Sequence, residues 1–308
     1  MTAIRDFDTL RKRLTQSDPV SVVVAGSASA PVVASLAEES RRGLVDRVVL
    51  LGDRDKLERL LHEVGAHENV FETEPCAADP AELAARAVAA IRDGRGSVLA
   101  KGGIDSAVLI RALLDRETGL RAGALVSNLT VFSGARYHKL LGVTDNGIVP
   151  APNAEQKVSF IMNALPVFEA LGVAPVKVAL VSASEKVLDS LPATGDAVSV
   201  REHFAQAVPA GRCIVEGPFG YDVCISREAA EHKGVRASEV AGDPDLLVFH
   251  DIEAANAVGK AIKFHGAAAS GGLLLGCSVP VMFNSRSDGP ERRSNSLLIA
   301  AAMAGAMR

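Results

Sequence analysis

The sequence predicts an α/β protein whose parallel sheets are covered by helices on both faces, arranged in two lobes with a cleft between them. Short runs of β-branched and aliphatic residues alternate with longer amphipathic segments along all 308 residues. Continuous apolar strands between helices are typical of parallel sheets that are buried on both faces. Aromatic residues make up only 4% of the chain, so the core is expected to consist of Ala, Val, Leu and Ile.

In the first half, each expected strand is a short apolar run and each expected helix an amphipathic segment. Helix and strand periodicities distinguish the two kinds of segment. Strands are expected at 21–25, 48–51 and 97–100, with a further strand ending near Val143, and helices at 31–42, 56–64, 80–93 and 107–114.

The second half repeats this alternation. Strands are expected at 176–181, 213–216, 246–249, 273–275 and 280–284, and helices at 154–171, 226–233, 253–268 and 295–307. Pro166 is expected to kink or break the first of these helices. The segment 266–285 has no charged residue, but its glycines and Pro280 predict strands and turns rather than a membrane span.

Charge and cysteine usage exclude several classes of protein. The net charge of −4 argues against nucleic acid or an anionic membrane as a partner. The four cysteines form no CxxC pair and have no histidine at metal-ligand spacing, which predicts neither a disulfide framework nor a metal site. Cys224 and Cys277 are expected to be buried structural thiols. Together with the absence of a visible signal peptide, this predicts a cytoplasmic chain with reduced thiols.

Nucleotide-binding glycine motifs are also missing. No GxGxxG follows the first strand and no GxxxxGK[ST] occurs in the chain, so neither a Rossmann dehydrogenase nor a P-loop enzyme is supported. The scattered histidines give no Ser-His-Asp arrangement of the hydrolase kind.

Polar, glycine-rich segments follow five of the expected strands. Ligands of open α/β sheets bind beyond the carboxyl ends of the strands, so these segments predict a site assembled from many loops. The segments are Lys101–Gly103, Thr144–Gly147, Glu216–Asp222, His250–Glu253 and Asn284–Gly289.

The last segment gives the clearest local signal. Arg286 offers a fork of donors that matches phosphate, and the hydroxyl of Ser285 can complete an oxyanion site. Arg292 and Arg293 add positive charge nearby. The alternative interpretation is a solvated basic loop capped by Asp288. Similarly, Lys101-Gly102 fits either a phosphate contact or a plain turn, and Asp145 either a base or a helix cap.

Ordered motifs run from about residue 98 to the end of the chain. They are Lys101-Gly102, Thr144-Asp145 followed by Glu155-Gln156-Lys157, Glu216-Gly217-Pro218 with Asp222, Asp251–Ala254 with Asn256, and Ser285–Asp288 with Asn295-Ser296. In this order they resemble the phosphate acetyl/butyryl transferase family, and the butyryl type more closely. No single motif is specific, but the ordered set is.

The resemblance implies a two-lobed, three-layer α/β/α fold like that of isocitrate and isopropylmalate dehydrogenases. Residues 1–132 and 277–308 would form the first domain and residues 133–276 the second, with the active site in the interdomain cleft. It implies that acyl-CoA and phosphate exchange reversibly with acyl phosphate and CoA, with CoA as a substrate and no permanently bound cofactor. It also implies a homodimer or a higher homo-oligomer.

The resemblance also implies the site residues. Arg286, Ser285 and Asp288 are the predicted catalytic residues. The predicted phosphate- or CoA-binding residues are Lys101, Gly102, Ser127, Asn128, Asp145, Asn146, Gly217, Pro218, Asp251, Glu253, Asn256 and Arg292.

The chain departs from the family pattern at several of these positions. Asn128 stands where butyryl-type members carry His, and Asn146 replaces a small residue or Cys. Ala255 replaces Gly, and Arg292 stands where acetyl-type members carry an Asp proposed as base. Two alternatives therefore remain beside acyl transfer: an altered family member that binds CoA or an anion, and an NAD-dependent dehydrogenase of the same fold.

Overall fold

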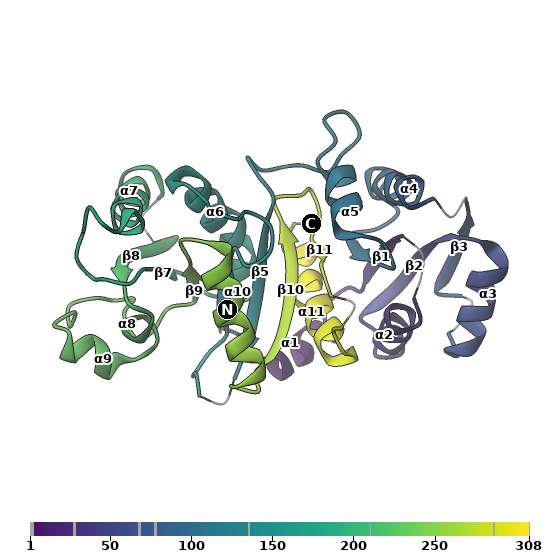
Figure 1. The fold of residues 1–308 in the computed structure, drawn as a ribbon. Helices are drawn as coiled ribbons and strands as arrows, with labels where there is room; N and C mark the ends of the chain where they lie inside the picture. The colour runs from purple at the N-terminus through teal and green to yellow at the C-terminus, as the bar shows by residue number, and fades with distance from the viewer. Residues whose placement is uncertain are drawn as a thin grey trace. The chain divides into compact units, whose positions relative to one another are not determined.

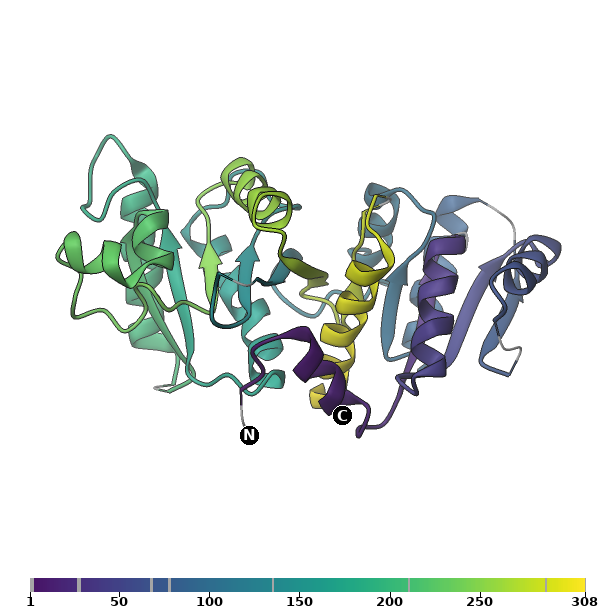
Figure 2. The ribbon, with the colours of Figure 1, turned by 90° about the horizontal axis from the view of Figure 1, so that it is seen from below.

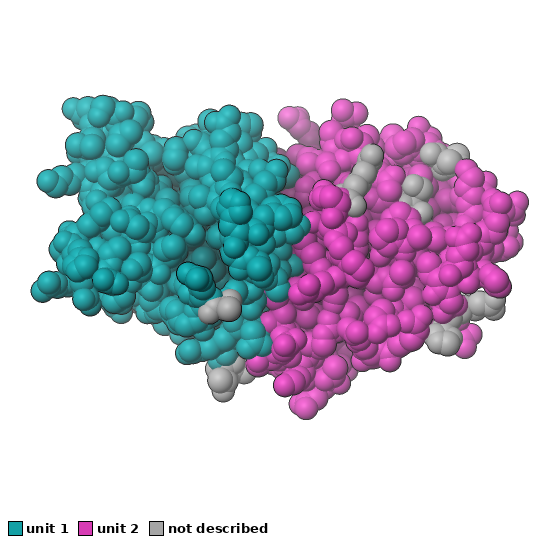
Figure 3. All heavy atoms as spheres, turned by 60° about the horizontal axis from the view of Figure 1, so that its bottom comes forward, with its two compact units in different colours: residues 1–6, 127–270 teal, residues 7–126, 271–308 magenta. Residues whose placement is uncertain are grey.

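The computed structural model describes residues 3–26, 29–66, 69–76, 79–134, 136–209, 211–285 and 287–307. The chain divides into two compact units, which Figure 3 colours separately. Unit 1 comprises residues 1–6 and 127–270, and unit 2 comprises residues 7–126 and 271–308. Both units are α/β, as the sequence predicts, whereas the expected domain boundaries at 132/133 and 276/277 remain a prediction.

Unit 2 is built on a mostly parallel sheet. Its strands are β1 (Val20–Ala25), β2 (Val45–Gly52), β3 (Phe71–Pro75), β4 (Val98–Lys101), β11 (Val281–Met282) and the 271–275 part of β10 (Ala269–Leu275). They lie in the order β3-β2-β1-β4-β11-β10. The pair β10–β11 is antiparallel and the other described pairs are parallel.

Helices cover both faces of this sheet. They are α1 (Phe7–Leu14), α2 (Ala30–Arg41), α3 (Arg54–Glu63), α4 (Pro80–Arg92), α5 (Ser106–Leu113) and α11 (Pro290–Met307). Helices α4 and α5 pack together on one face, and α2 and α11 on the other, where α1 contacts α11 (Figures 1 and 2). Asp53, Asp79 and Asp105 begin α3, α4 and α5 by accepting a backbone N–H bond, as helix caps do.

Unit 1 has the same layers. Its strands are β5 (Ser127–Ser133), β6 (Leu141–Thr144), β7 (Val176–Val181), β8 (Cys213–Phe219) and β9 (Leu246–Val248), in the order β5-β6-β9-β7-β8. Helices α6 (Ala154–Ala170) and α7 (Pro192–Ala207) cover one face. Helices α8 (Tyr221–Ile225), α9 (Arg227–His232) and α10 (Ile252–Phe264) cover the other (Figure 1). Only β5 and β6 pair in antiparallel fashion among the described strands of this unit.

Helices α6 and α11 differ from the expected helices in ways that have a local cause. Helix α6 continues through Pro166, so the expected break is absent. Helix α11 begins at Pro290, five residues before the expected start at Asn295, because a polar turn that carries two arginines precedes its apolar part. None of the described helices is both long and apolar enough to span a bilayer.

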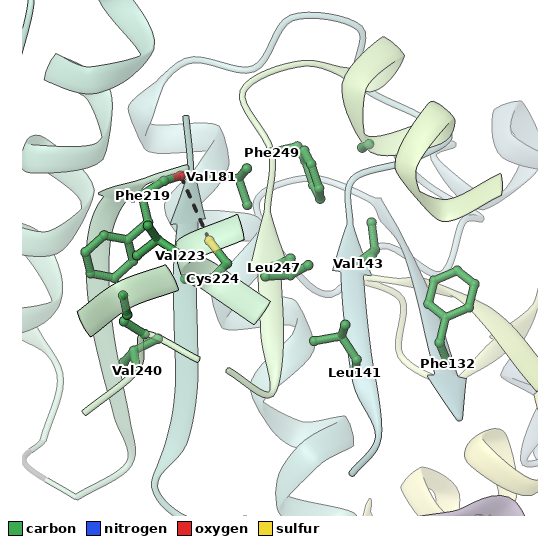
Figure 4. Packing of buried hydrophobic residues seen from close by; sticks show 14 of the residues in the cluster. Phe132, Leu141, Val143, Val181, Phe219, Val223, Cys224, Val240, Leu247 and Phe249 are labelled. Atoms are coloured by element: carbon green, nitrogen blue, oxygen red, sulfur yellow. Dashed lines mark hydrogen bonds between the residues drawn. The ribbon is translucent and has the colours of Figure 1, made fainter. Parts of the chain in front are cut away.

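The cores consist mainly of aliphatic side chains, as the composition predicts. In unit 1, Val143, Leu247 and Val223 pack with Phe219 and Cys224 in one buried cluster (Figure 4). Burial raises the pKa of the Cys224 thiol far above its usual range. Burial also raises the pKa of Cys277 to about 12. Both thiols therefore stay protonated at neutral pH, and the prediction that they are buried is confirmed.

In unit 1, a cluster of charged side chains links the β5–β6 connection and β7 to the segment that precedes β9. The Asp243 carboxylate lies 2.5 Å from Lys177 Nζ, 3.0 Å from Lys139 Nζ and 2.6 Å from His138 Nε2. Lys139 Nζ also lies 2.8 Å from the carboxylate of the buried Asp245. Burial disfavours the charge of Asp243, but the hydrogen bonds from Lys177 and Lys139 outweigh it and hold the pKa of Asp243 well below its usual range.

Acid is expected to unfold unit 1 partly through Asp243. The pKa of Asp243 is lower in the folded state than in the unfolded chain, where an aspartate has a pKa of about 3.9. The carboxylate therefore contributes fully to the free energy of unfolding above the unfolded-state pKa, and this contribution is lost as the pH falls through the folded-state pKa. Asp243→Asn should lower the free energy of unfolding by about 1–3 kcal/mol at pH 6. Urea titrations from pH 6 to pH 2 should show this difference shrinking. A difference that is independent of pH would contradict the prediction, and Asp189→Asn, at an exposed aspartate of the same unit, is the control.

Candidate active site

The loop that joins β11 to α11 is held together by Asp288. This side chain is 7% exposed, and its Oδ2 accepts hydrogen bonds from the backbone N–H of Ser285 at 2.8 Å and from Arg292 Nε at 3.0 Å. Ser285 itself is exposed, and its Oγ lies 3.1 Å from the hydroxyl of Ser287. Asp288 therefore organises the segment that presents Ser285. Its predicted catalytic role stays a prediction, and Arg286 lies outside the described residues.

Ser296 of helix α11 also holds this loop in place. It lies in the Asn-Ser motif of the sequence, where it had no assigned role. The fully buried Ser296 Oγ accepts hydrogen bonds from Gly272 N at 2.9 Å and from Asn284 Nδ2 at 3.0 Å. The close approach of the helix requires Gly271, where an added Cβ would lie 2.8 Å from the backbone of Asn295. The Asn-Ser motif thus fixes β10, α11 and the loop that begins at Asn284.

The end of β4 contributes the predicted Lys101 and Gly102. Lys101 is 7% exposed, and Gly102 N donates a 2.8 Å hydrogen bond to the carbonyl of Ala25 at the end of β1. Lys101 lines a small cavity together with Asn284 and Arg293, two residues to which the sequence analysis gave no individual role. We call residues 284–293 the cation loop, because Arg292 and Arg293 lie in it.

In unit 1, the buried Asp145 follows β6 and accepts four backbone hydrogen bonds. Its Oδ1 accepts from Asn128 N at 3.2 Å, Gly147 N at 2.9 Å and Ile148 N at 3.1 Å, and its Oδ2 accepts from Val149 N at 2.9 Å. Burial raises the pKa of Asp145, and these four N–H groups oppose that rise. Of the two roles that the sequence left open, base or cap, the geometry resembles a cap, because both oxygens bind main-chain donors of the loop.

Beside this loop, three amide side chains and a hydroxyl form what we call the amide cluster: Asn128, Thr130, Asn146 and Asn256. Asn146 Nδ2 donates to Thr130 Oγ1 at 3.1 Å, and Asn256 Nδ2 donates to the carbonyl of Asn146 at 3.1 Å. Asn128 is 7% exposed, and its Nδ2 has no hydrogen-bond partner in the described part of the chain. The cluster therefore holds Asn146 and Asn256 in place and leaves two donors of a buried amide open.

Asn256 lies on α10, near Asp251 and Glu253. Asp251 begins the helix by accepting a 2.7 Å hydrogen bond from Ala254 N, and Glu253 is exposed on the first turn. Ser127, at the start of β5, is fully buried and accepts a 3.0 Å hydrogen bond from Asn163 Nδ2 on α6. These residues lie around the same end of β5 and β6 as the amide cluster.

Gly217 and Pro218 lie apart from that cluster. They are on β8, and the strand order places β6, β9 and β7 between β8 and β5, which corresponds to about 19 Å at the usual strand spacing. A glycine is required at 217, because its φ is +136° and an added Cβ would lie 2.7 Å from the carbonyl oxygen of Leu180. In this structure Gly217 fits β8 closely to β7.

The described residues include no group of three or more His, Cys, Asp or Glu side chains placed to hold a metal ion. Hydrogen-bond donors and cations at strand ends predominate instead. Such an arrangement can bind anions and polarise carbonyl groups.

An α/β fold with polar segments at the strand ends is also the fold of phosphotransacylases. The crystal structure of a branched-chain phosphotransacylase from Enterococcus faecalis matches this chain with a TM-score of 0.79 and 27% identity, covering 92% of this chain and 99% of that one. The family model described as "Phosphate acetyl/butaryl transferase" matches residues 79–301.

Curated relatives agree. This chain is 31% identical over 304 residues to a phosphate butyryltransferase from Clostridium acetobutylicum, covering 98% of this chain and 99% of the relative. It is 34% identical over 256 residues to a phosphate acetyltransferase from Thermotoga maritima, covering 83% and 86%. The chain therefore belongs to the phosphate acetyl/butyryl transferase family, as its motifs predict, and is an acyltransferase. Acyl transfer between CoA and phosphate is favoured over both alternatives.

Proposed function

We propose that this enzyme transfers a short-chain acyl group reversibly between CoA and inorganic phosphate, with both substrates bound together. A phosphate oxygen attacks the thioester carbonyl carbon, a C–O bond forms, and the C–S bond breaks as the thiolate leaves. The thiol pKa of about 8.5 makes this thiolate a good leaving group without a metal. The feature that supports the proposal most is the cation loop, which exposes the Ser285 hydroxyl after β11 and carries Arg292 and Arg293.

In this proposal the cation loop binds the phosphate group. Arg286 and Ser285 contact it, Arg292 and Lys101 add positive charge, and the backbone at Gly102 shapes the turn. Asp288 keeps the loop in position through its bonds to Ser285 and Arg292. Charge-assisted bonds from arginine to phosphate are among the stronger hydrogen bonds in proteins, and they strengthen where water is excluded.

The amide cluster is proposed to hold the acyl thioester. The open Nδ2 donors of Asn128 can bind the carbonyl oxygen on which negative charge develops. Because an amide does not titrate, this donor is present at every pH at which the protein is folded. Ser127, Asp145, Asn146 and Asn256 support it, and CoA contacts for Gly217, Pro218, Asp251 and Glu253 remain predictions.

The setting of the enzyme is also part of the proposal. We infer a cytoplasmic protein, because the four cysteines are free thiols and two of them are buried. We also infer a homodimer or a higher homo-oligomer, as the resemblance to the family implies. Size-exclusion chromatography coupled to light scattering measures the second inference directly.

A thiol-release assay tests the function. Purified protein with saturating phosphate and a panel from acetyl-CoA to branched and hydroxylated acyl-CoAs should release CoA only when phosphate is present. Arg286→Ala should lower this rate by about 100-fold or more, because it removes a charge-assisted contact made to the reacting group. Arg47→Ala is the matched control, since Arg47 is an exposed arginine of the same unit that pairs with Glu72.

The proposal would be refuted if no acyl-CoA gave phosphate-dependent CoA release while calorimetry showed that the folded protein still binds CoA. That result would favour an altered family member that binds CoA without transferring an acyl group. An absorbance change that depends on a nicotinamide cofactor would instead favour the dehydrogenase.

A further inference from the structure

One arginine of the cation loop is buried with an unsatisfied donor. Arg293, in the first turn of α11, is 6% exposed, and its Nε has no hydrogen-bond partner among the described residues. One terminal nitrogen, Nη2, donates a 3.1 Å hydrogen bond to the carbonyl of Ser285. A buried donor of a charged group that lacks an acceptor is costly, so a site of this kind is stabilised when an acceptor occupies it.

The side chain of Arg293 lines a cavity of about 10 Å³ in unit 2. The other lining residues come from α2, β4, β11 and the start of the cation loop, and none of them is acidic: Val32, Ser35, Leu36, Ala100, Lys101, Met282 and Asn284. Lys101, itself 7% exposed, brings a second positive charge to the same cavity. Burial lowers the pKa of Arg293, and the nearby Asp288 opposes this.

The size of the cavity limits what it can hold. A space of this volume admits one water-sized group. A single oxygen of a phosphate group has that size and carries the negative charge that Arg293 and Lys101 favour. A complete phosphate does not fit, so its remaining oxygens would lie outside the cavity.

We propose that this cavity receives one oxygen of a substrate phosphate group, that of inorganic phosphate or acyl phosphate, and that Arg293 Nε is its hydrogen-bond donor. This inference rests on the proposed function and adds a phosphate-binding residue that the motifs did not indicate. The same guanidinium holds the carbonyl of Ser285. Binding of phosphate and the position of the serine that contacts it are therefore coupled through one side chain.

CoA also carries phosphate groups, so kinetics must separate the two sources. In Arg293→Gln the KM for phosphate and for acyl phosphate should rise by about tenfold or more, as expected for one lost charge-assisted bond. The KM for acyl-CoA and for CoA should stay within about twofold of the wild type. Lys101→Met should show the same pattern more weakly, and Arg47→Gln, the exposed arginine control, should show none of it.

Thermal unfolding provides a readout that needs no turnover. Inorganic phosphate should raise the melting temperature of the wild type and not that of Arg293→Gln. If the glutamine variant fails to fold, Arg293→Lys is measured instead, because it keeps the charge.

If the wild type turns over no acyl-CoA but shows this phosphate-dependent shift in melting temperature, the proposed function is wrong and the phosphate site at Arg293 is supported. A rise in the KM for CoA alone would assign the cavity to a CoA phosphate and overturn the inference. The inference would also be overturned if Arg293→Gln lowered kcat with unchanged KM values, or if phosphate did not shift the melting temperature of the wild type. Either result would identify the cavity as a structural, water-filled one.

Discussion

Asp145→Ala should lower the free energy of unfolding by about 3–5 kcal/mol, because four main-chain N–H groups lose their acceptor at once. Each unsatisfied buried donor costs about 1–3 kcal/mol, and water can reach part of the 147–149 loop, which keeps the total below the sum. Acyl transfer should fall by about 100-fold, because Asn128 and Asn146 lose the loop that positions them. Urea unfolding and the thiol-release assay measure the two effects.

Asp53→Ala is the matched control for this change. Asp53 is also a loop aspartate, but it accepts one backbone hydrogen bond at the exposed start of α3, so its loss should cost only about 1 kcal/mol. Asp145→Asn keeps one acceptor oxygen and should fall between the two. If Asp145→Ala and Asp53→Ala destabilised the protein equally, the four bonds to Asp145 would not hold the loop.

Apolar runs were the part of the fold that the sequence could predict. Strands β1, β2, β7 and β9 each contain a run of buried aliphatic residues, and all four overlap the segments that the sequence indicated. Strand β3 was missed because its sequence, FETEP, alternates charged residues and lies at the edge of the strand order of unit 2. There Glu72 and Glu74 pair with Arg47 and Arg95, so ion pairs replace apolar burial.

The sequence indicated segments for a candidate site, but it could not give the contacts within them. Ligands of α/β sheets bind beyond the carboxyl ends of the strands, and Lys101, Asp145 and the cation loop each follow a strand of their own unit, which is why they could be picked out. The acceptor role of Asp145 depends on the loop that follows it, and residue spacing does not encode that loop. Arg293 was noted only as positive charge near this segment, because only the packing of α11 against α2 and β4 shows that its side chain is buried.

A buried ion pair anchors the helix that carries this arginine. Glu39 of α2 is 1% exposed and accepts hydrogen bonds from Arg11 of α1 at 2.6 and 3.1 Å and from Ser294 Oγ of α11 at 2.6 Å. Arg11 also donates to Ser294. Three helices therefore meet at one carboxylate, and Ser294 directly follows Arg293.

Glu39→Gln should lower the free energy of unfolding by about 3–5 kcal/mol, because Arg11 is left largely buried without its counterion. The neighbouring Glu38→Gln is the control: Glu38 pairs with Arg41 and Arg42, but it is 46% exposed, so its loss should cost less than about 1 kcal/mol. Replacing both Arg11 and Glu39 by Met should recover most of the lost stability, since no unpaired charge then remains. If the double variant were as unstable as Glu39→Gln, packing at the junction of the three helices, not charge, would hold α11 and its arginines in place.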